Sequence, residues 1–261
     1  MNIGMSGAAF YGRMETENTA AYLTRFPIDC CEIFLQTGSE YTGAFGRLVR
    51  EKLAGLRCVS VHAKGNQFEW DLFGRSPRQA EDAFRLFTGV CDAGQAMGAR
   101  YYVFHGPAGV HAPLTPERIH ALPQVWARME EIAAARGLTV LWENVSWCAL
   151  RRPEDVRSLI GLAPDVRFVL DVKQARRSGV DPFALLDAMG SRVAHVHALD
   201  WTEDDAWRLP GEGVLDWRRL AMQLRAQGFD GTVMLEPYAS LAGNDCALTR
   251  SLAFLRRVLQ L

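Results

Sequence analysis

Two histidines interrupt an apolar segment near the C-terminal end of the chain. The segment reads VAHVHALDW, from Val193 to Trp201, and His195 and His197 stand two residues apart in it. Side chains alternate across a strand, so both imidazole rings would point to the same side. Two interpretations are open: the rings form hydrogen bonds inside a core, or one of them binds a metal ion while the other supports it.

Five other short apolar segments also end on a histidine or an acidic residue. These residues are His62, His105, Glu143, Asp171 and Glu236. Any strand leaves a protein core through polar residues, so each case alone has an ordinary structural explanation. Together with His197, however, all six segments end on His, Asp or Glu and none ends on Ser, Thr or Lys. This bias favours a shared chemical role.

Four of these residues form a set of ligands typical of a metal site. Carboxylates that share a site without a cation repel one another and lose hydration. Glu143, Asp171, His197 and Glu236 provide three carboxylates and one imidazole, which suits Mn²⁺, Mg²⁺, Co²⁺ or Zn²⁺. We therefore predict one divalent metal ion held by these four residues. His195, one layer deeper, is predicted to be a structural neighbour that supports the interior or the ligands.

The elements that position these residues are short apolar strands that alternate with longer amphipathic helices. Helix starts are indicated where a capping residue precedes a proline, at Ser76-Pro77, Thr115-Pro116 and Asp181-Pro182. Two helical patterns finish at a glycine, Gly98 and Gly137. The predicted strands cover residues 2–7, 30–36, 58–63, 101–106, 139–145, 166–172, 193–198 and 232–237.

This alternation predicts a single α/β domain over residues 1–261, folded as a closed (β/α)8 TIM barrel. No hairpin turn separates neighbouring strands, so parallel pairing is expected throughout. The alternative, an open doubly wound sheet, usually carries a GxGxxG loop after its first strand, which GMSGAAFYG does not match. Active sites of TIM barrels lie at the C-terminal ends of the strands, where the six polar residues are expected to meet.

Composition and net charge limit the kinds of partner that are expected. The chain has 261 residues, of which 49% are hydrophobic and 23% charged, and a formal net charge of -1. This balance gives no indication of a nucleic-acid or membrane partner. No apolar run is long enough to span a bilayer, the first residues lack the pattern of a signal peptide, and the six cysteines show no CxxC spacing. We expect a cytoplasmic protein with reduced thiols.

The order and spacing of the motifs resemble the xylose isomerase-like TIM barrels. This superfamily holds sugar isomerases, ketose 3-epimerases, inosose dehydratases and the AP endonucleases of family 2, and the resemblance covers essentially the full chain. In its isomerase and epimerase branches a Glu, Asp, His and Glu hold the metal, which implies Glu143, Asp171, His197 and Glu236 here. The motifs are VHA (61–63), FHGP (104–107), WENV (142–145), LDVKQA (170–175), HVHALD (195–200), PGEGVLDW (210–217) and LEPY (235–238).

Two departures from the superfamily narrow the expected activity. The DNA-repair branch needs a histidine where this chain has Gln174, and a D-x-H motif where it reads Asp205-Ala206-Trp207. Both changes remove ligands of a trinuclear zinc site and disfavour an AP endonuclease. Ketose 3-epimerases usually carry a substrate-binding histidine at the position of Gln174, although a glutamine also forms hydrogen bonds with a hydroxyl.

The resemblance implies that Glu143 and Glu236 act as an acid/base pair next to a carbonyl that the cation polarises. One glutamate removes the α-proton, and the other returns a proton to the opposite face or to the neighbouring carbon. His62 and His105 then line the pocket, as hydrogen-bond donors or as ligands of a second metal. The predicted substrate contacts are His62, His105, Trp147, Gln174 and Arg208.

Other residues near the expected pocket mouth leave two interpretations open. The aromatic side chains either stack on a sugar or cover the core. Lys64, Lys173 and Arg208 either meet a phosphate or form surface ion pairs, and the absence of a glycine-rich phosphate loop after the seventh strand favours a non-phosphorylated substrate. The aromatic residues in question are Phe68, Trp70, Trp147, Trp201 and Trp207.

The leading hypothesis is a metal-dependent isomerase or epimerase of a small-molecule sugar or polyol. The alternative is a lyase similar to inosose dehydratase, which uses the same metal but loses a β-hydroxyl. A barrel that only binds a sugar or a partner is a third hypothesis, which intact metal ligands disfavour. A homo-oligomer is compatible with the sequence. In a barrel of this kind the loops select the substrate.

Overall fold

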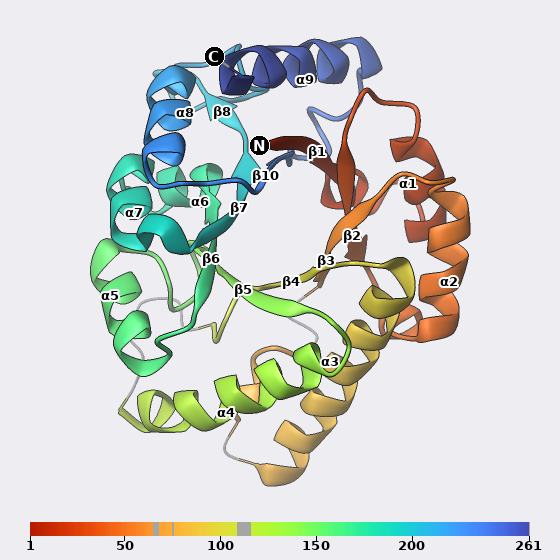
Figure 1. Ribbon diagram of the computed structural model, residues 1–261, viewed down its shortest axis with the longest axis vertical. Helices are drawn as coiled ribbons and strands as arrows, with labels where there is room; N and C mark the ends of the chain where they lie inside the picture. Colours follow the sequence, from red (N-terminus) through yellow and green to blue (C-terminus); the bar gives the residue numbers. More distant parts are fainter. Residues whose placement is uncertain (65–67, 75, 109–115, 261) are drawn as a thin grey trace.

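Parallel strands form a closed barrel at the centre of the computed structural model, and helices surround it (Figure 1). The structure describes residues 1–64, 68–74, 76–108 and 116–260, without the side chains of residues 116–120. β10 pairs with β1 and closes the barrel, which confirms the predicted (β/α)8 TIM barrel. In the described residues its strands are β1 (Asn2–Ser6), β2 (Cys30–Leu35), β3 (Cys58–Ala63), β4 (Tyr101–Phe104), β5 (Thr139–Glu143), β6 (Arg167–Asp171), β7 (Val193–Ala198) and β10 (Thr232–Leu235).

Helices cover the outside of the barrel (Figure 1). Ser76 and Asp181 accept hydrogen bonds from backbone N–H groups in the first turns of α3 and α7, so these predicted helix starts are confirmed. The predicted start at Thr115 lies outside the described residues. Gly98 ends α3 in the left-handed conformation, with a φ of 80°. The helices are α1 (Thr16–Leu23), α2 (Gly43–Lys52), α3 (Pro77–Met97), α4 (Pro116–Ala134), α5 (Pro153–Leu162), α6 (Val172–Arg177), α7 (Pro182–Met189), α8 (Trp217–Ala226) and α9 (Asp245–Gln260).

The barrel strands orient the residues of interest through simple alternation. Leu141 precedes Glu143 by two residues on β5, and Val169 precedes Asp171 by two residues on β6, so each pair shares one side of its strand. Leu141 and Val169 belong to a small buried apolar cluster that is separate from the main hydrophobic core. The acidic side chains therefore follow an apolar layer inside the barrel and lie nearer to its rim.

The motif PGEGVLDW has a structural role in the loop that follows β7. This loop begins with a two-stranded antiparallel hairpin, β8 (Asp200–Trp201) and β9 (Trp207–Arg208). The buried carboxylate of Asp200 accepts hydrogen bonds from the backbone N–H groups of Trp201, Gly211 and Leu215, and from the indole N–H of Trp217. A Cβ on Gly213 would lie 2.2 Å from Asp200 Oδ1, so only glycine fits there.

Asp200→Asn is expected to destabilise the fold. An amide offers one acceptor oxygen instead of two and turns an N–H₂ group toward existing donors, which should lower the free energy of unfolding by about 2–4 kcal/mol. The exposed Asp165→Asn is the matched control, with an expected effect within about 0.5 kcal/mol. Urea denaturation of both variants measures the difference, and equal midpoints would show that the Asp200 contacts do not hold the loop.

Candidate active site

Four residues at the carboxyl ends of β5, β6, β7 and β10 form a compact buried cluster. They are the four predicted ligands, Glu143, Asp171, His197 and Glu236, and one ligand atom of each lies within 4.8 Å of the others. His197 Nδ1 lies 2.9 Å from Glu143 Oε1, 3.5 Å from Glu236 Oε2 and 3.9 Å from Asp171 Oδ2. Because neighbouring ligands of one ion are separated by distances of this order, the cluster can surround a single cation.

The donor atoms of the cluster fit a divalent cation. Among the described residues, the buried atoms Glu143 Oε2 and Asp171 Oδ2 accept no hydrogen bond. Burial raises the pKa of Asp171 to about 7, which Lys173 opposes and the carboxylates of Glu143 and Glu236 reinforce. Three carboxylates in one buried cluster are unfavourable unless positive charge compensates them. The oxygen and nitrogen set suits Mn²⁺, Mg²⁺, Co²⁺ or Zn²⁺.

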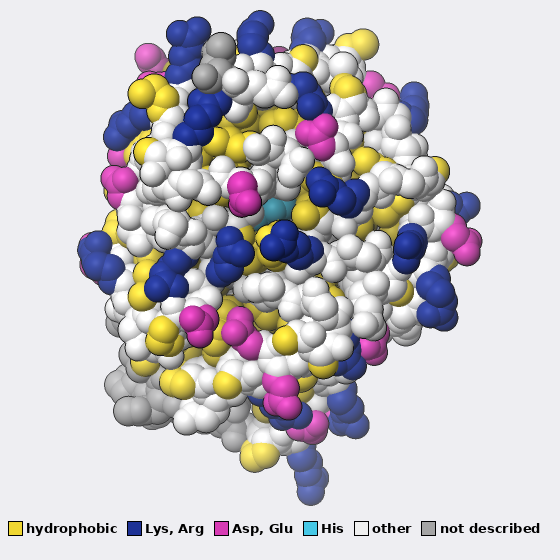
Figure 2. Space-filling model, in the orientation of Figure 1, with side chains coloured by type: hydrophobic (Ala, Val, Ile, Leu, Met, Phe, Trp, Pro, Cys, Tyr) yellow, Lys and Arg dark blue, Asp and Glu magenta, His cyan; other side chains and the backbone are white. Residues whose placement is uncertain are grey.

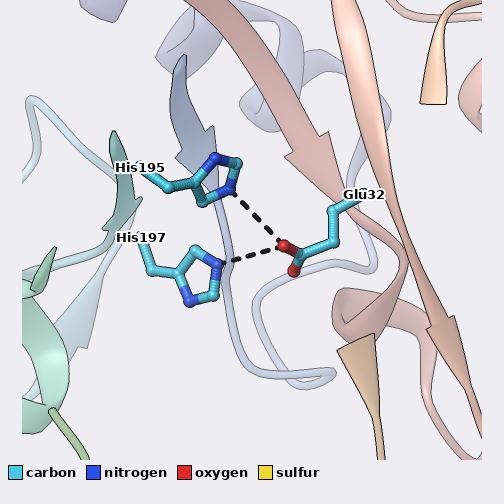
Figure 3. Close-up of side chains that lie close together, drawn as sticks. All are labelled: Glu32, His195 and His197. Carbon is cyan, nitrogen blue, oxygen red and sulfur yellow. Dashed lines mark hydrogen bonds and ion pairs between the residues drawn. The ribbon is translucent and has the colours of Figure 1, made fainter. Parts of the chain in front are cut away.

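His197 contacts the cluster with one ring nitrogen and a buried glutamate with the other. Its Nε2 lies 3.4 Å from Glu32 Oε2 (Figure 3), whereas its Nδ1 lies 2.9 Å from Glu143 Oε1. Burial opposes a positive charge on His197, but Glu236, Glu32 and Glu143 raise its pKa well above the usual range. Binding a cation at Nδ1 requires loss of the proton there, and Glu32 then holds the remaining proton on Nε2.

Glu32 lies in the middle of β2 and is a site residue that the sequence patterns missed. Its carboxylate accepts hydrogen bonds from Ser6 Oγ at 2.9 Å and from Ser60 Oγ at 2.7 Å. Burial alone would raise the pKa of Glu32, but His197 and His195 lower it well below its usual range. A single acidic residue inside the buried strand CCEIFL is the signal that could have identified it.

His195 is not one of the four clustered residues but lies beside His197. It is fully buried, its Nε2 lies 3.4 Å from Glu32 Oε2, and its ring meets that of His197 edge-on (Figure 3). Burial lowers the pKa of His195, so the ring is neutral. This position beside Glu32 is consistent with the predicted supporting role, and Glu32, His195 and His197 also form a separate group with ligand atoms close together.

His62 and His105 contact each other on the wall of the site. Their Nε2 atoms lie 2.7 Å apart, and His105 Nδ1 lies 3.0 Å from Oε2 of the buried Glu69. Burial opposes a charge on His105, but Glu69 raises its pKa to about 9. Glu69 therefore favours a proton on His105, and the short contact between the two rings is a hydrogen bond. Because His62, His105 and Glu143 also bring ligand atoms together, both predicted roles for the two histidines, donor and ligand, stay open.

A cavity of about 300 Å³ opens next to the cluster. Figure 2 shows a hollow in this face of the molecule, with histidine visible at its bottom. Glu143 and Glu236 line the cavity, and so do four of the five predicted substrate contacts: His62, His105, Trp147 and Gln174. The fifth, Arg208, is exposed on β9, donates to the carbonyl of Trp207 and does not line the cavity.

The aromatic residues expected at the mouth divide into distinct groups. Trp147 lines the cavity and contacts the ring of His105, while Trp70 is exposed and packs edge-on against Trp147. Phe68 and Trp201 are buried, which matches the alternative that such residues cover the core. Trp207 packs against Tyr238, a cavity residue that the sequence patterns did not indicate.

Lys173 and Gln174 make contacts inside the protein that the sequence did not predict. Lys173 was expected either at a phosphate or in a surface ion pair, but it is buried, with Nζ 2.8 Å from Glu236 Oε2 and 3.5 Å from Asp171 Oδ2. Gln174 Oε1 accepts hydrogen bonds from the backbone N–H and the hydroxyl of Ser146. This contact occupies the amide oxygen of Gln174, so its N–H₂ group is the part that could donate to a substrate.

Several solved structures share this fold at low sequence identity. A D-psicose 3-epimerase solved in the presence of D-fructose has a TM-score of 0.81 and 14% identity, with 99% of each chain covered. The 3-keto-D-glucoside 4-epimerase YcjR from E. coli has a TM-score of 0.75 and 20% identity over 98% of this chain and 99% of the other. The IolI protein with a bound zinc atom has a TM-score of 0.75 and 16% identity, covering 99% of this chain and 96% of the other.

Sequence comparison places the chain in a family. A comparison with curated protein sequences found no match, whereas a family model does match the chain. Separately, no helix in the described residues combines the length and the apolar character needed to cross a membrane. The model of the xylose isomerase-like TIM barrel family matches residues 21–258. Since this match spans most of the sequence and the barrel is closed, the chain belongs to the xylose isomerase-like TIM barrel family.

Proposed function

We propose that the protein is a divalent-metal-dependent isomerase or epimerase of a sugar or related polyol, with Glu143 and Glu236 as its acid/base pair. The observation that carries this proposal is that both glutamates belong to a four-residue cluster with ligand geometry and also line the adjacent cavity. Structural neighbours named as sugar epimerases, and one with bound zinc, support the same class of reaction.

Glu143, Asp171, His197 and Glu236 would hold the cation, which, when bound, supplies a Lewis acid that polarises a substrate carbonyl. One of the two glutamates removes the proton from the carbon next to the carbonyl, and the other returns a proton. Delivery to the opposite face of the same carbon gives an epimer, whereas delivery to the neighbouring carbon gives an isomer. Glu32 keeps the proton of His197 on Nε2, so that Nδ1 faces the cluster.

A lyase reaction is the second candidate, and the position of His105 beside Glu69 at the cavity favours it. Loss of a β-hydroxyl needs a proton donor near the leaving oxygen, and His105 is a cavity residue whose pKa Glu69 raises to about 9 although burial opposes this. Mass spectrometry of the product distinguishes the two reactions, because dehydration removes the mass of water while epimerisation and isomerisation leave the mass unchanged.

Glu236→Gln is expected to abolish turnover in a protein that stays folded. An amide of the same size cannot accept or return a proton, so kcat on a panel of ketoses with added Mn²⁺ should fall by at least about 10³-fold. Glu154→Gln, on the exposed surface of α5, is the control and should leave kcat unchanged. Circular dichroism checks the fold of both variants, and near-normal turnover by folded Glu236→Gln would exclude the acid/base role.

The two histidines of β7 provide a matched pair that tests the metal site. After removal of metal with EDTA, added Zn²⁺ at 100 times its Kd should stabilise the wild-type protein by about 2.7 kcal/mol, because the ion binds only the folded state. His195→Asn should lower the melting temperature but keep this stabilisation by Zn²⁺. His197→Asn should lose the stabilisation.

Thermal melts with and without Zn²⁺ measure this response for all three proteins. If the Zn²⁺ response disappeared in His195→Asn and persisted in His197→Asn, the two rings would have the opposite roles. A wild-type protein that shows no response to any of the four candidate ions would contradict the proposed metal dependence.

A further inference from the structure

Lys173 is a buried cation that contacts the four-residue cluster and lines the adjacent cavity. It is the second residue of α6, which follows β6 directly, and its Nζ lies 2.8 Å from Glu236 Oε2 and 3.5 Å from Asp171 Oδ2. The ammonium also lies 5.1 Å from the centre of the Tyr238 ring. Lys173 lines the same cavity as Glu143 and Glu236, so one of its faces is available to a bound substrate.

The charge balance of the site indicates what this ammonium contributes. When Glu143, Asp171 and Glu236 are all ionised, as ligands of a cation would be, they carry three negative charges, one more than a divalent cation would compensate. A centre with this residual charge would repel any negative charge that develops on a substrate oxygen. Lys173 supplies one positive charge beside Asp171 and Glu236, and it lines the cavity in which that oxygen would lie.

We propose that Lys173 is a catalytic residue whose ammonium donates a hydrogen bond to the substrate oxygen that becomes negative during proton abstraction. This inference rests on the proposed isomerase or epimerase function. In the step, the C–H bond next to the carbonyl breaks and its proton passes to a glutamate carboxylate. The electron pair forms the C=C bond of an enediolate, the carbonyl π electrons move to oxygen, and Lys173 stabilises the resulting charge. Return of a proton to carbon reverses these changes.

A structural role for Lys173 makes a different prediction. If its ammonium only neutralises Asp171 and Glu236, its removal should weaken metal binding and affect all ligands equally. If it contacts the developing oxyanion, its removal should weaken the binding of anionic mimics of the enediolate far more than the binding of neutral polyols. Comparison of two such probes separates the roles without measuring turnover.

The experiment uses the Zn²⁺-loaded full chain and the variants Lys173→Met and Lys173→Arg. The matched control is Lys64→Met, because Lys64 is a half-buried lysine whose ammonium lies over the ring of Tyr11 at the cavity. Calorimetry gives the Kd of two probes, an aldonohydroxamate as the enediolate mimic and D-sorbitol as the neutral polyol. Elemental analysis gives the zinc content of each protein.

Lys173→Met is expected to weaken the binding of the hydroxamate by about 10²–10³-fold, which is the range for loss of one oxyanion donor. It should lower kcat on a ketose that the wild type converts to a similar extent. The Kd of D-sorbitol, the KM and the zinc content should stay close to those of the wild type. Lys173→Arg should recover part of the hydroxamate affinity, and Lys64→Met should match the wild type with both probes.

Equal weakening of both probes, unchanged hydroxamate affinity, or loss of zinc in folded Lys173→Met would overturn the catalytic role. If Lys173→Met does not fold, Lys173→Gln replaces it, with the same expected selective loss. A wild-type protein that holds zinc but binds neither probe contradicts the proposed function itself, whereas failure confined to the Lys173 variants contradicts only this inference.

Discussion

Electrostatic repulsion between three buried carboxylates is the constraint on which the site depends. Glu143, Asp171 and Glu236 come from different strands, and the closed barrel brings their oxygens to one point on its rim. Burial removes the water that would otherwise screen them, so their charges have to be balanced by the protein or by a bound ion. His197 and Lys173 supply part of this balance within the chain. A divalent cation would complete it, and under the proposed function that cation would polarise a substrate carbonyl.

The layer below the cluster shows how a barrel interior supports such a site. Glu32 is buried at the level of Ser6 and Ser60, whose hydroxyls donate to it, and it faces His197 across the barrel. Without these donors the glutamate would be costly to bury, and its contact with Nε2 favours a proton on that nitrogen of His197. Polar contacts inside the barrel therefore help to orient the His197 ring at its rim.

Much of the fold and the four-residue cluster could be predicted from sequence because both follow from simple periodicities. All eight barrel strands lie within two residues of their expected bounds, and residues at the ends of parallel strands meet at one rim. The partners of Glu32, Glu69 and Lys173 could not be predicted in this way. Their contacts depend on which strands face each other across the barrel and on how long side chains bend. The Arg208 side chain illustrates the same limit, because the hairpin after β7 turns it outward.

Zinc anomalous diffraction from crystals of the metal-loaded protein tests the central claim most directly. We expect one strong peak at about 2.0–2.2 Å from Nδ1 of His197 and from an oxygen of each of Glu143, Asp171 and Glu236. Absence of a peak in this cluster, or a peak bound only by Glu32 and His195, would contradict the claim that these four residues share a cation.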